Sequence, residues 1–257
     1  MSISGLLRLK ATAKRIPAKM TLREVGTWAY APYADPDHIH AADIDMAVVN
    51  YSIDGTDEGC PTPKEMELMR RGPDGAPRII LCNLAAAVAD PSRPYWPQGG
   101  MPGWAISDWK DGYAVYIMSK EWRAILLEEV EKAIGAGFDG IFLDCDYLVP
   151  VDLDMADLVW HVREKIGNRT LVVANGEYMV PIPGFLDIVD GLARVGLYSV
   201  ESSIYERDEV EDYLVYAEDK PIFVVEFVQD EDDAHGMRRR VSEMGWNPCI
   251  VTPHGFT

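Results

Sequence analysis

The sequence predicts a single-domain α/β protein, a (β/α)8 (TIM) barrel with a basic N-terminal extension. Short apolar runs rich in valine and isoleucine alternate with amphipathic segments, the pattern of buried parallel strands separated by helices. The chain has 257 residues, a common length for one barrel of this kind. We therefore expect the barrel to span residues 24–257 and the extension to span residues 1–23.

Eight strands are expected, and their alternation with helices favours a closed barrel over a doubly wound sheet. The predicted strands are residues 24–30, 44–51, 78–83, 140–143, 170–175, 196–200, 222–227 and 248–252. The helices predicted between them include residues 120–136, 153–166, 183–190, 207–216 and 234–244. Thr62 and Pro63 mark the start of a further helix, as the capping residue and a proline in the first turn.

One segment, residues 89–112, is rich in proline, glycine and tryptophan and lies between the third and fourth predicted strands. It is too long for a simple connection in a compact domain. Long loops of this kind often carry function, so we expect it to form a lid or wall over one end of the barrel.

The composition argues against several classes of partner and cofactor. A net charge of −18 and a pI near 4.6 argue against nucleic acid, which requires a basic surface. No run of 18 apolar residues is present, so no membrane span is expected. The four cysteines are too widely spaced to indicate a disulfide framework, and the histidines lack ligand spacing, so we expect neither a metal nor another cofactor.

The first 23 residues are basic and contain no acidic residue. Their cationic residues are Arg8, Lys10, Lys14, Arg15, Lys19 and Arg23. The apolar stretches among them are too short and interrupted for the apolar core of a secretory signal. We expect this extension to pack on the barrel or to contact a protein partner, and the cellular compartment stays open.

The run of residues 137–147 indicates a catalytic position. A helix ends at a glycine turn, and a short apolar strand then leads to Asp144 and Asp146. In parallel α/β proteins, active sites are built at the C-terminal ends of the strands. Asp144 is therefore a candidate catalytic acid, and Asp146 is a candidate for positioning Asp144 or a substrate hydroxyl.

Polar side chains also stand at or near the ends of other predicted strands and would converge on one mouth of a barrel. They are Asn50, Asn83, Asn175, Glu177, Glu201, Glu226 and His254. Pattern alone leaves alternatives for three of them. Glu201 could pair with a buried arginine instead of acting in catalysis, and Asn175 could merely hold a turn. Glu226 could face into the barrel or away from it.

Aromatic residues are concentrated in the same loops, and flat apolar faces beside carboxylates and amides suit a sugar. With the polar groups Asp146, Asn175, Glu177, Glu226 and Asn50, the residues expected to contact substrate are Tyr30, Tyr51, Trp96, Trp109 and Tyr147. Glycoside hydrolysis needs two carboxyl groups flanking the scissile bond. The pattern thus favours a glycoside hydrolase acting on a polysaccharide or oligosaccharide.

A series of motifs in the same order resembles glycoside-hydrolase family 114, the endo-α-1,4-polygalactosaminidases. The matching segments are residues 49–58, 93–96, 102–104, 109–113, 137–144, 175–177 and 200–202. The resemblance implies an eight-stranded barrel that hydrolyses an α-1,4-linked, galactosamine-rich polymer. It also implies that Asp144 and Glu201 form the catalytic pair. Enzymes of this family usually act outside the cell.

The chain departs from the family pattern at the second and third strands. Asn50 stands where relatives have an aspartate, and Val88 and Asp90 replace the two glutamates of a Gly-Glu-Ala-Glu motif. Two alternative hypotheses accompany the hydrolase, the first because of these departures and the second because several carboxylates could hold a metal ion. One is a catalytically inactive carbohydrate-binding or structural barrel in a larger assembly. The other is a metal-dependent hydrolase that uses Asp144, Asp146 and Glu226.

Overall fold

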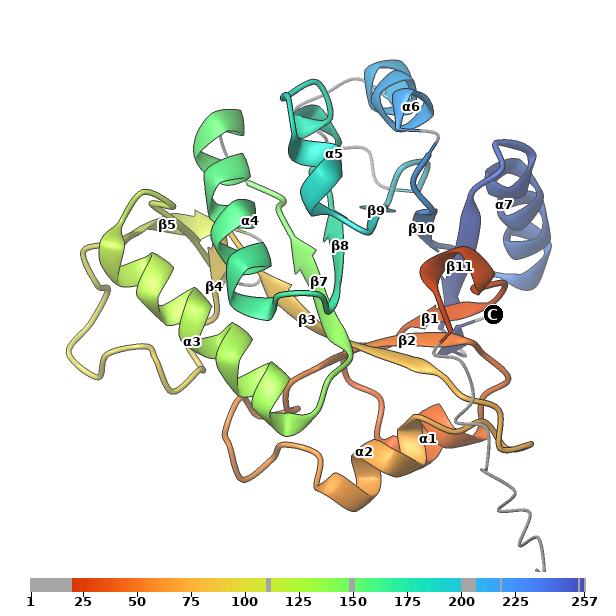
Figure 1. Cartoon of the computed structure of the whole chain (residues 1–257), viewed down its shortest axis with the longest axis horizontal. Helices are drawn as coiled ribbons and strands as arrows, with labels where there is room; N and C mark the ends of the chain where they lie inside the picture. Colours follow the sequence, from red (N-terminus) through yellow and green to blue (C-terminus); the bar gives the residue numbers. More distant parts are fainter. Residues whose placement is uncertain are drawn as a thin grey trace, which may run out of the picture.

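The computed structural model describes residues 20–109, 112–147, 151–199, 207–217, 219–253 and 255–256. The described chain forms a (β/α)8 barrel, which confirms the predicted fold class (Figure 1). Eight strands pair in parallel, in the order β1-β2-β3-β7-β8-β9-β10-β11. They are β1 (Trp28–Tyr30), β2 (Met46–Asn50), β3 (Ile79–Ala85), β7 (Gly140–Asp144), β8 (Thr170–Ala174), β9 (Gly191–Val195), β10 (Ile222–Phe227) and β11 (Asn247–Thr252).

The first and last parallel strands close the barrel through individual hydrogen bonds. The Trp28 indole N–H donates to the Asn247 carbonyl oxygen at 3.0 Å, and the Tyr30 backbone N–H lies 3.3 Å from Cys249 Sγ. A short strand, β12 (Gly255–Phe256), pairs antiparallel with β11. The strands therefore enclose one interior instead of forming an open sheet.

Helices alternate with the strands along the chain and surround them (Figure 1). The α-helices are α1 (Pro36–Ala41), α2 (Pro63–Met69), α3 (Lys120–Ala136), α4 (Asp152–Ile166), α5 (Phe185–Ile188), α6 (Arg207–Tyr216) and α7 (Glu231–Glu243); the 3-10 turns are η1 (Leu22–Glu24) and η2 (Glu177–Met179). Thr62 caps α2 as predicted, since its hydroxyl accepts from the Glu65 N–H and the Glu65 carboxylate accepts from the Thr62 N–H. Gly137 ends α3 with a φ of 101°, a left-handed conformation that suits glycine.

The period-two alternation of each strand separates two cores. Val48, Leu81 and Phe142 belong to the cluster inside the barrel, whereas their strand neighbours pack in the larger cluster beneath the helices. Leu22 of η1 also belongs to the interior cluster, so this part of the expected N-terminal extension is packed into the barrel. Because of the same alternation, the polar residue two positions after each of these three interior residues also points toward the barrel axis.

The proline- and tryptophan-rich segment contains a small antiparallel sheet beside the barrel. Its strands, in the order β4-β6-β5, are β4 (Val88–Ala89), β6 (Gly112–Val115) and β5 (Ala105–Trp109). This sheet lies between β3 and α3 in the chain, next to the C-terminal ends of β3 and β7 (Figure 1). It forms a wall beside the end of the barrel where the candidate residues converge.

One predicted strand was misplaced. The sixth parallel strand is β9 (Gly191–Val195), whereas we predicted residues 196–200. Arg194 interrupts the apolar character of the true strand, and the apolar residues that follow it form a connection. A buried ion pair, described below, satisfies Arg194 and allows a charged residue in the strand. As a result, Glu201 lies six positions after the strand ends at Val195 and not directly after it.

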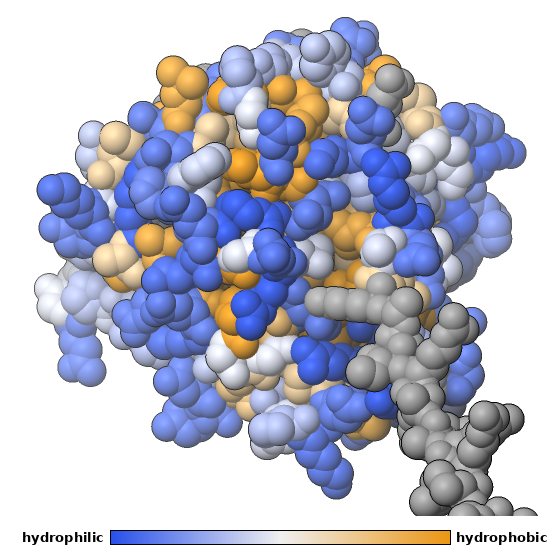
Figure 2. Space-filling view, viewed as in Figure 1, coloured by the Kyte–Doolittle hydropathy of each residue, from blue (hydrophilic) through white to orange (hydrophobic). Residues whose placement is uncertain are grey.

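The face of the molecule seen in Figure 2 is mainly hydrophilic. Figure 2 shows hydrophilic residues over most of the face in view, with hydrophobic residues in small groups between them. Among the described helices, none is long and apolar enough to cross a membrane.

Candidate active site

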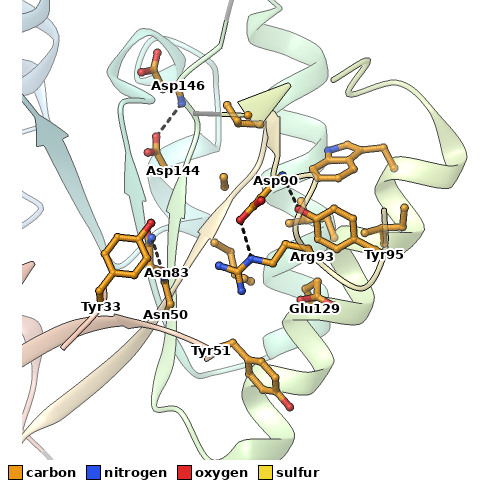
Figure 3. Close-up of a pocket in the computed structure, with 17 residues that line it drawn as sticks. Tyr33, Asn50, Tyr51, Asn83, Asp90, Arg93, Tyr95, Glu129, Asp144 and Asp146 are labelled. Carbon is orange, nitrogen blue, oxygen red and sulfur yellow. Dashed lines mark hydrogen bonds and ion pairs between the residues drawn. The ribbon is translucent and has the colours of Figure 1, made fainter. Parts of the chain in front are cut away.

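A cavity of about 350 Å³ opens at the C-terminal ends of β2, β3 and β7 (Figure 3). These strands contribute Asn50, Asn83 and Asp144, all at inward-facing positions. Tyr51 and Asp146 follow the same strands and line the same space. The remaining polar and aromatic residues around it are Tyr33, Asp90, Arg93, Tyr95, Trp122 and Glu129. The predicted positions Asp144, Asp146, Asn50 and Tyr51 are therefore brought together.

Asp144 is the last residue of β7 and is oriented by two N–H donors. Its Oδ1 accepts from the Asp146 backbone N–H at 3.0 Å and from Asn175 Nδ2 at 2.8 Å. The side chain stays partly exposed and lines the cavity. Such an arrangement presents a positioned carboxyl group to a ligand, as acid–base or nucleophilic catalysis requires.

Asn175 lies behind Asp144 and not in the cavity lining. Its Oδ1 accepts from the Val195 N–H at 3.0 Å, so its amide connects the end of β9 to Asp144. Its φ of 53° is left-handed, a conformation that asparagine adopts more readily than most residues. Asn175 is 6% exposed and both of its polar side-chain atoms are bonded within the protein. Its amide therefore orients Asp144 and is not part of the cavity surface in this structure.

The wall formed by β2 and β3 is made of amides. Asn83 Nδ2 donates to Asn50 Oδ1 at 3.0 Å, and Asn83 Oδ1 is buried without a hydrogen-bond partner among the described atoms. Tyr30 packs inside the barrel, with its ring 5.7 Å from that of Phe142, and is not part of the lining. This wall of the cavity is therefore formed by a neutral, hydrogen-bonded pair of amides.

The turn after β4 brings a cation into the cavity. Nε of Arg93 donates to Asp90 Oδ2 at 3.2 Å, while Asp90 Oδ1 accepts from the Ser92 N–H and hydroxyl. Burial opposes ionisation of Asp90, but the bonds from Ser92 and the charge of Arg93 outweigh it and lower the pKa of that carboxyl. The sequence alone assigns no role to Arg93, which lies in the motif of residues 93–96.

The aromatic wall differs from the one predicted. Tyr95 and Trp122 line the cavity, with their rings 5.8 Å apart and nearly perpendicular. Trp96 instead packs against Trp104, at 5.5 Å, in the core of the wall. Trp109 ends β5 outside the lining as well. Neither tryptophan presents a face to the cavity in this structure.

Glu129 also lines the cavity, although the sequence pattern did not predict it as a site residue. It lies on α3 seven residues after Trp122 and three after Leu126, on the helix face that packs against the barrel. Its carboxylate accepts from Lys132 at 3.0 Å. A carboxylate on the apolar face of an amphipathic helix was the available signal.

Three other predicted substrate contacts are buried. Glu177 is 1% exposed and pairs with Arg194 at 2.8 Å. Burial raises the pKa of the Glu177 carboxyl, and the Arg194 charge opposes that shift. Tyr147 is 5% exposed and donates to Asp152 Oδ1 at 2.7 Å. These side chains support the loops behind the cavity and are not open to a ligand in this conformation.

Glu226 is the third buried residue, fully enclosed near the end of β10. It shares a strand face with Val224, which packs beneath the helices, so it points away from the barrel interior. Its carboxylate accepts from the Tyr198 N–H and from the Ser199 N–H and hydroxyl, at 2.6–3.2 Å. Glu226 therefore holds the connection that follows β9. Glu201 and His254 lie outside the described residues.

The metal-dependent alternative loses its third ligand, because Glu226 does not line the cavity with Asp144 and Asp146. Within the described ranges, no group of three or more histidine, cysteine or acidic side chains is arranged to hold a metal ion.

Comparison with known proteins establishes the fold. No family model matches the chain. It is 26% identical over 248 residues to an uncharacterized protein of Methanocaldococcus jannaschii, covering 84% of this chain and 70% of that one. An uncharacterized protein of Thermotoga maritima is 25% identical over 240 residues, covering 80% and 72%.

Two solved structures share the barrel. The glycoside hydrolase domain of PelA from Pseudomonas aeruginosa matches with a TM-score of 0.64 at 16% identity, over 88% of this chain and 94% of that chain. Ega3 from Aspergillus fumigatus, solved in complex with galactosamine, gives the same score and identity over 88% and 91%. The fold is thus one used by glycoside hydrolases, and membership of family 114 stays a prediction.

Proposed function

We propose that the protein is a glycoside hydrolase that cleaves an α-1,4-linked, galactosamine-rich polysaccharide. The observation that carries this proposal is the placement of Asp144, which ends a parallel strand inside a cavity and is oriented by two N–H donors. Support also comes from the barrel shared with the glycoside hydrolase domain of PelA and with Ega3, which was solved with galactosamine.

Asp144 and Glu201 act as the two catalytic carboxyl groups. One protonates the oxygen of the leaving sugar, and the other attacks the anomeric carbon or activates the attacking water. Asp146, Asn50 and Tyr51 contact sugar hydroxyls from the cavity wall. Asn175 acts through Asp144, whose carboxylate it orients.

The test compares wild type with Asp144→Asn and Glu201→Gln on an α-1,4-galactosamine polysaccharide, measuring released reducing ends. Each variant should lose roughly 10²- to 10⁴-fold in kcat. Glu67→Gln is the matched control, because Glu67 is exposed on α2 and, among the residues that the structure describes, pairs with Arg71 alone. Wild-type turnover by either carboxyl variant would remove that residue from the mechanism, and no turnover by wild type would remove the proposed reaction.

A second candidate, a non-catalytic carbohydrate-binding barrel, is favoured by one observation. Asn50, which is bonded to Asn83, and Val88 line the cavity at positions where the family pattern carries acids. Titration calorimetry that shows saturable binding of an α-1,4-galactosamine oligosaccharide, with no release of reducing ends over days, would support this candidate over the hydrolase.

A further inference from the structure

Arg93 presents unused donors to the cavity. Its side chain is 19% exposed, and its Nε is bonded to Asp90. Among the described residues, its two Nη groups have no hydrogen-bond partner. Figure 3 shows the guanidinium reaching from the turn toward the middle of the cavity. Because a guanidinium carries five N–H donors, the groups on both Nη atoms remain for a ligand.

The guanidinium is held in place from two sides. Asp90 anchors Nε, and Asp90 is itself fixed by the N–H and hydroxyl of Ser92. Gly55 packs against the other side, where a Cβ atom would lie 2.4 Å from Arg93 Cδ and 2.9 Å from Nη1. Gly55 has a φ of 79°, which also disfavours any side chain there. Arg93 is therefore oriented before any ligand arrives.

Opposite groups in the cavity suit the same kind of ligand. The Asn50–Asn83 pair supplies amide groups, and Tyr95 supplies apolar ring surface. The charge of Glu129 is balanced by Lys132, and the charge of Asp90 by Arg93 itself. This part of the cavity offers oriented donors beside flat apolar surface, which fits the hydroxyl and ring oxygen atoms of a sugar.

We propose that Arg93 is a substrate-binding residue whose two Nη groups donate hydrogen bonds to neutral oxygen atoms of the sugar unit bound beside Asp144. This inference rests on the proposed function and adds a recognition group to the same site. Preorganisation by Asp90 and Gly55 lowers the conformational cost of binding. A lysine would keep the charge but lose the planar fork, so it could not make both contacts.

The experiment measures binding separately from turnover. Titration calorimetry with an α-1,4-galactosamine tetrasaccharide is carried out on Asp144→Asn protein, with and without Arg93→Lys. Arg93→Lys should raise the Kd roughly ten- to hundredfold, while Tm stays within about 3 °C. Arg71→Lys is the matched control, since its guanidinium pairs with Glu67 on the exposed surface of α2.

The Kd and Tm of Arg93→Lys together test the role of Arg93. A tenfold or larger rise in Kd at preserved Tm, absent from Arg71→Lys, supports it. A smaller rise, or a loss of binding that appears only with a larger fall in Tm, overturns it and leaves the proposed hydrolysis standing. No tetrasaccharide binding before Arg93 is changed overturns both the proposed substrate and this inference.

Discussion

Replacing Asn175 with glycine tests whether its amide orients Asp144. Asn175 Nδ2 donates to Asp144 Oδ1 at 2.8 Å, and its Oδ1 accepts from the Val195 N–H. Glycine removes both bonds but adopts the left-handed φ of 53° without strain. The backbone of the turn is therefore kept while the contact to the carboxylate is lost.

The expected fall in activity follows from the hydrogen bond to Asp144 that the variant loses. A hydrogen bond to a charged group contributes about 1.5–3 kcal/mol, so kcat/KM should fall roughly 10- to 150-fold. Asn175→Ala should lose as much activity, because it lacks the same amide. The free energy of unfolding of Asn175→Ala should be about 1 kcal/mol lower than that of Asn175→Gly, because a left-handed φ is strained for alanine.

Reducing-end release from an α-1,4-galactosamine polysaccharide measures activity, and urea unfolding measures stability. Asn247→Ala is the control, because Asn247 Nδ2 donates to the Ile222 carbonyl at 3.2 Å at the opposite end of the barrel. It should lose stability and keep kcat/KM. If Asn175→Gly keeps wild-type kcat/KM, or loses no more than Asn247→Ala, the orienting role is wrong.

Two further predictions concern buried carboxylates. Arg194→Met leaves the buried Glu177 carboxyl group without its cationic partner, so we expect a loss of about 3–5 kcal/mol in the free energy of unfolding, measured in urea. Adding Glu177→Met should recover most of that loss. Burial raises the pKa of Glu226 despite its hydrogen bonds from Ser199 and Tyr198. The folded state therefore binds that proton more tightly than the unfolded state, and this contribution to stability is lost as pH rises from about 4.3 through the raised pKa. The free energy of unfolding of wild type should therefore fall relative to that of Glu226→Gln as pH rises over this range.

For each of these two predictions, one result would contradict the reasoning. If Arg194→Met and the double variant unfold at the same urea concentration as wild type, the ion pair does not stabilise the fold. If the unfolding free energies of wild type and Glu226→Gln stay parallel from pH 4 to 8, the pKa of Glu226 is not raised.

The fold was largely predictable because parallel strands and helices leave local periodic patterns. The runs that became β2, β7 and β10 are short, apolar and β-branched, and the structure places strands there. The prediction misplaced β9 because an arginine usually indicates a surface position, and only the folded structure shows that Glu177 pairs with Arg194. That partner lies 17 positions away, so no local pattern contains it.

The candidate site was predictable to the extent that strand ends define it. Asp144 and Asn50 were found because a residue that ends an apolar parallel strand must reach the same mouth. Arg93 and Glu129 were missed as site residues because their approach depends on the wall and on the packing of α3. Trp96 was expected in the cavity, but composition does not show which tryptophans pack against each other.

The local sequence determined the barrel strands and the position of Asp144 at a strand end, because the spacing of apolar residues decides which side chains turn inward. The tertiary structure alone assigned the other polar residues their places. Asn175 orients Asp144, Glu177 pairs with Arg194, and Glu226 holds the connection after β9. The physical reason is that a buried polar group must find a partner, and that partner is set by the register of neighbouring strands and not by its neighbours in sequence.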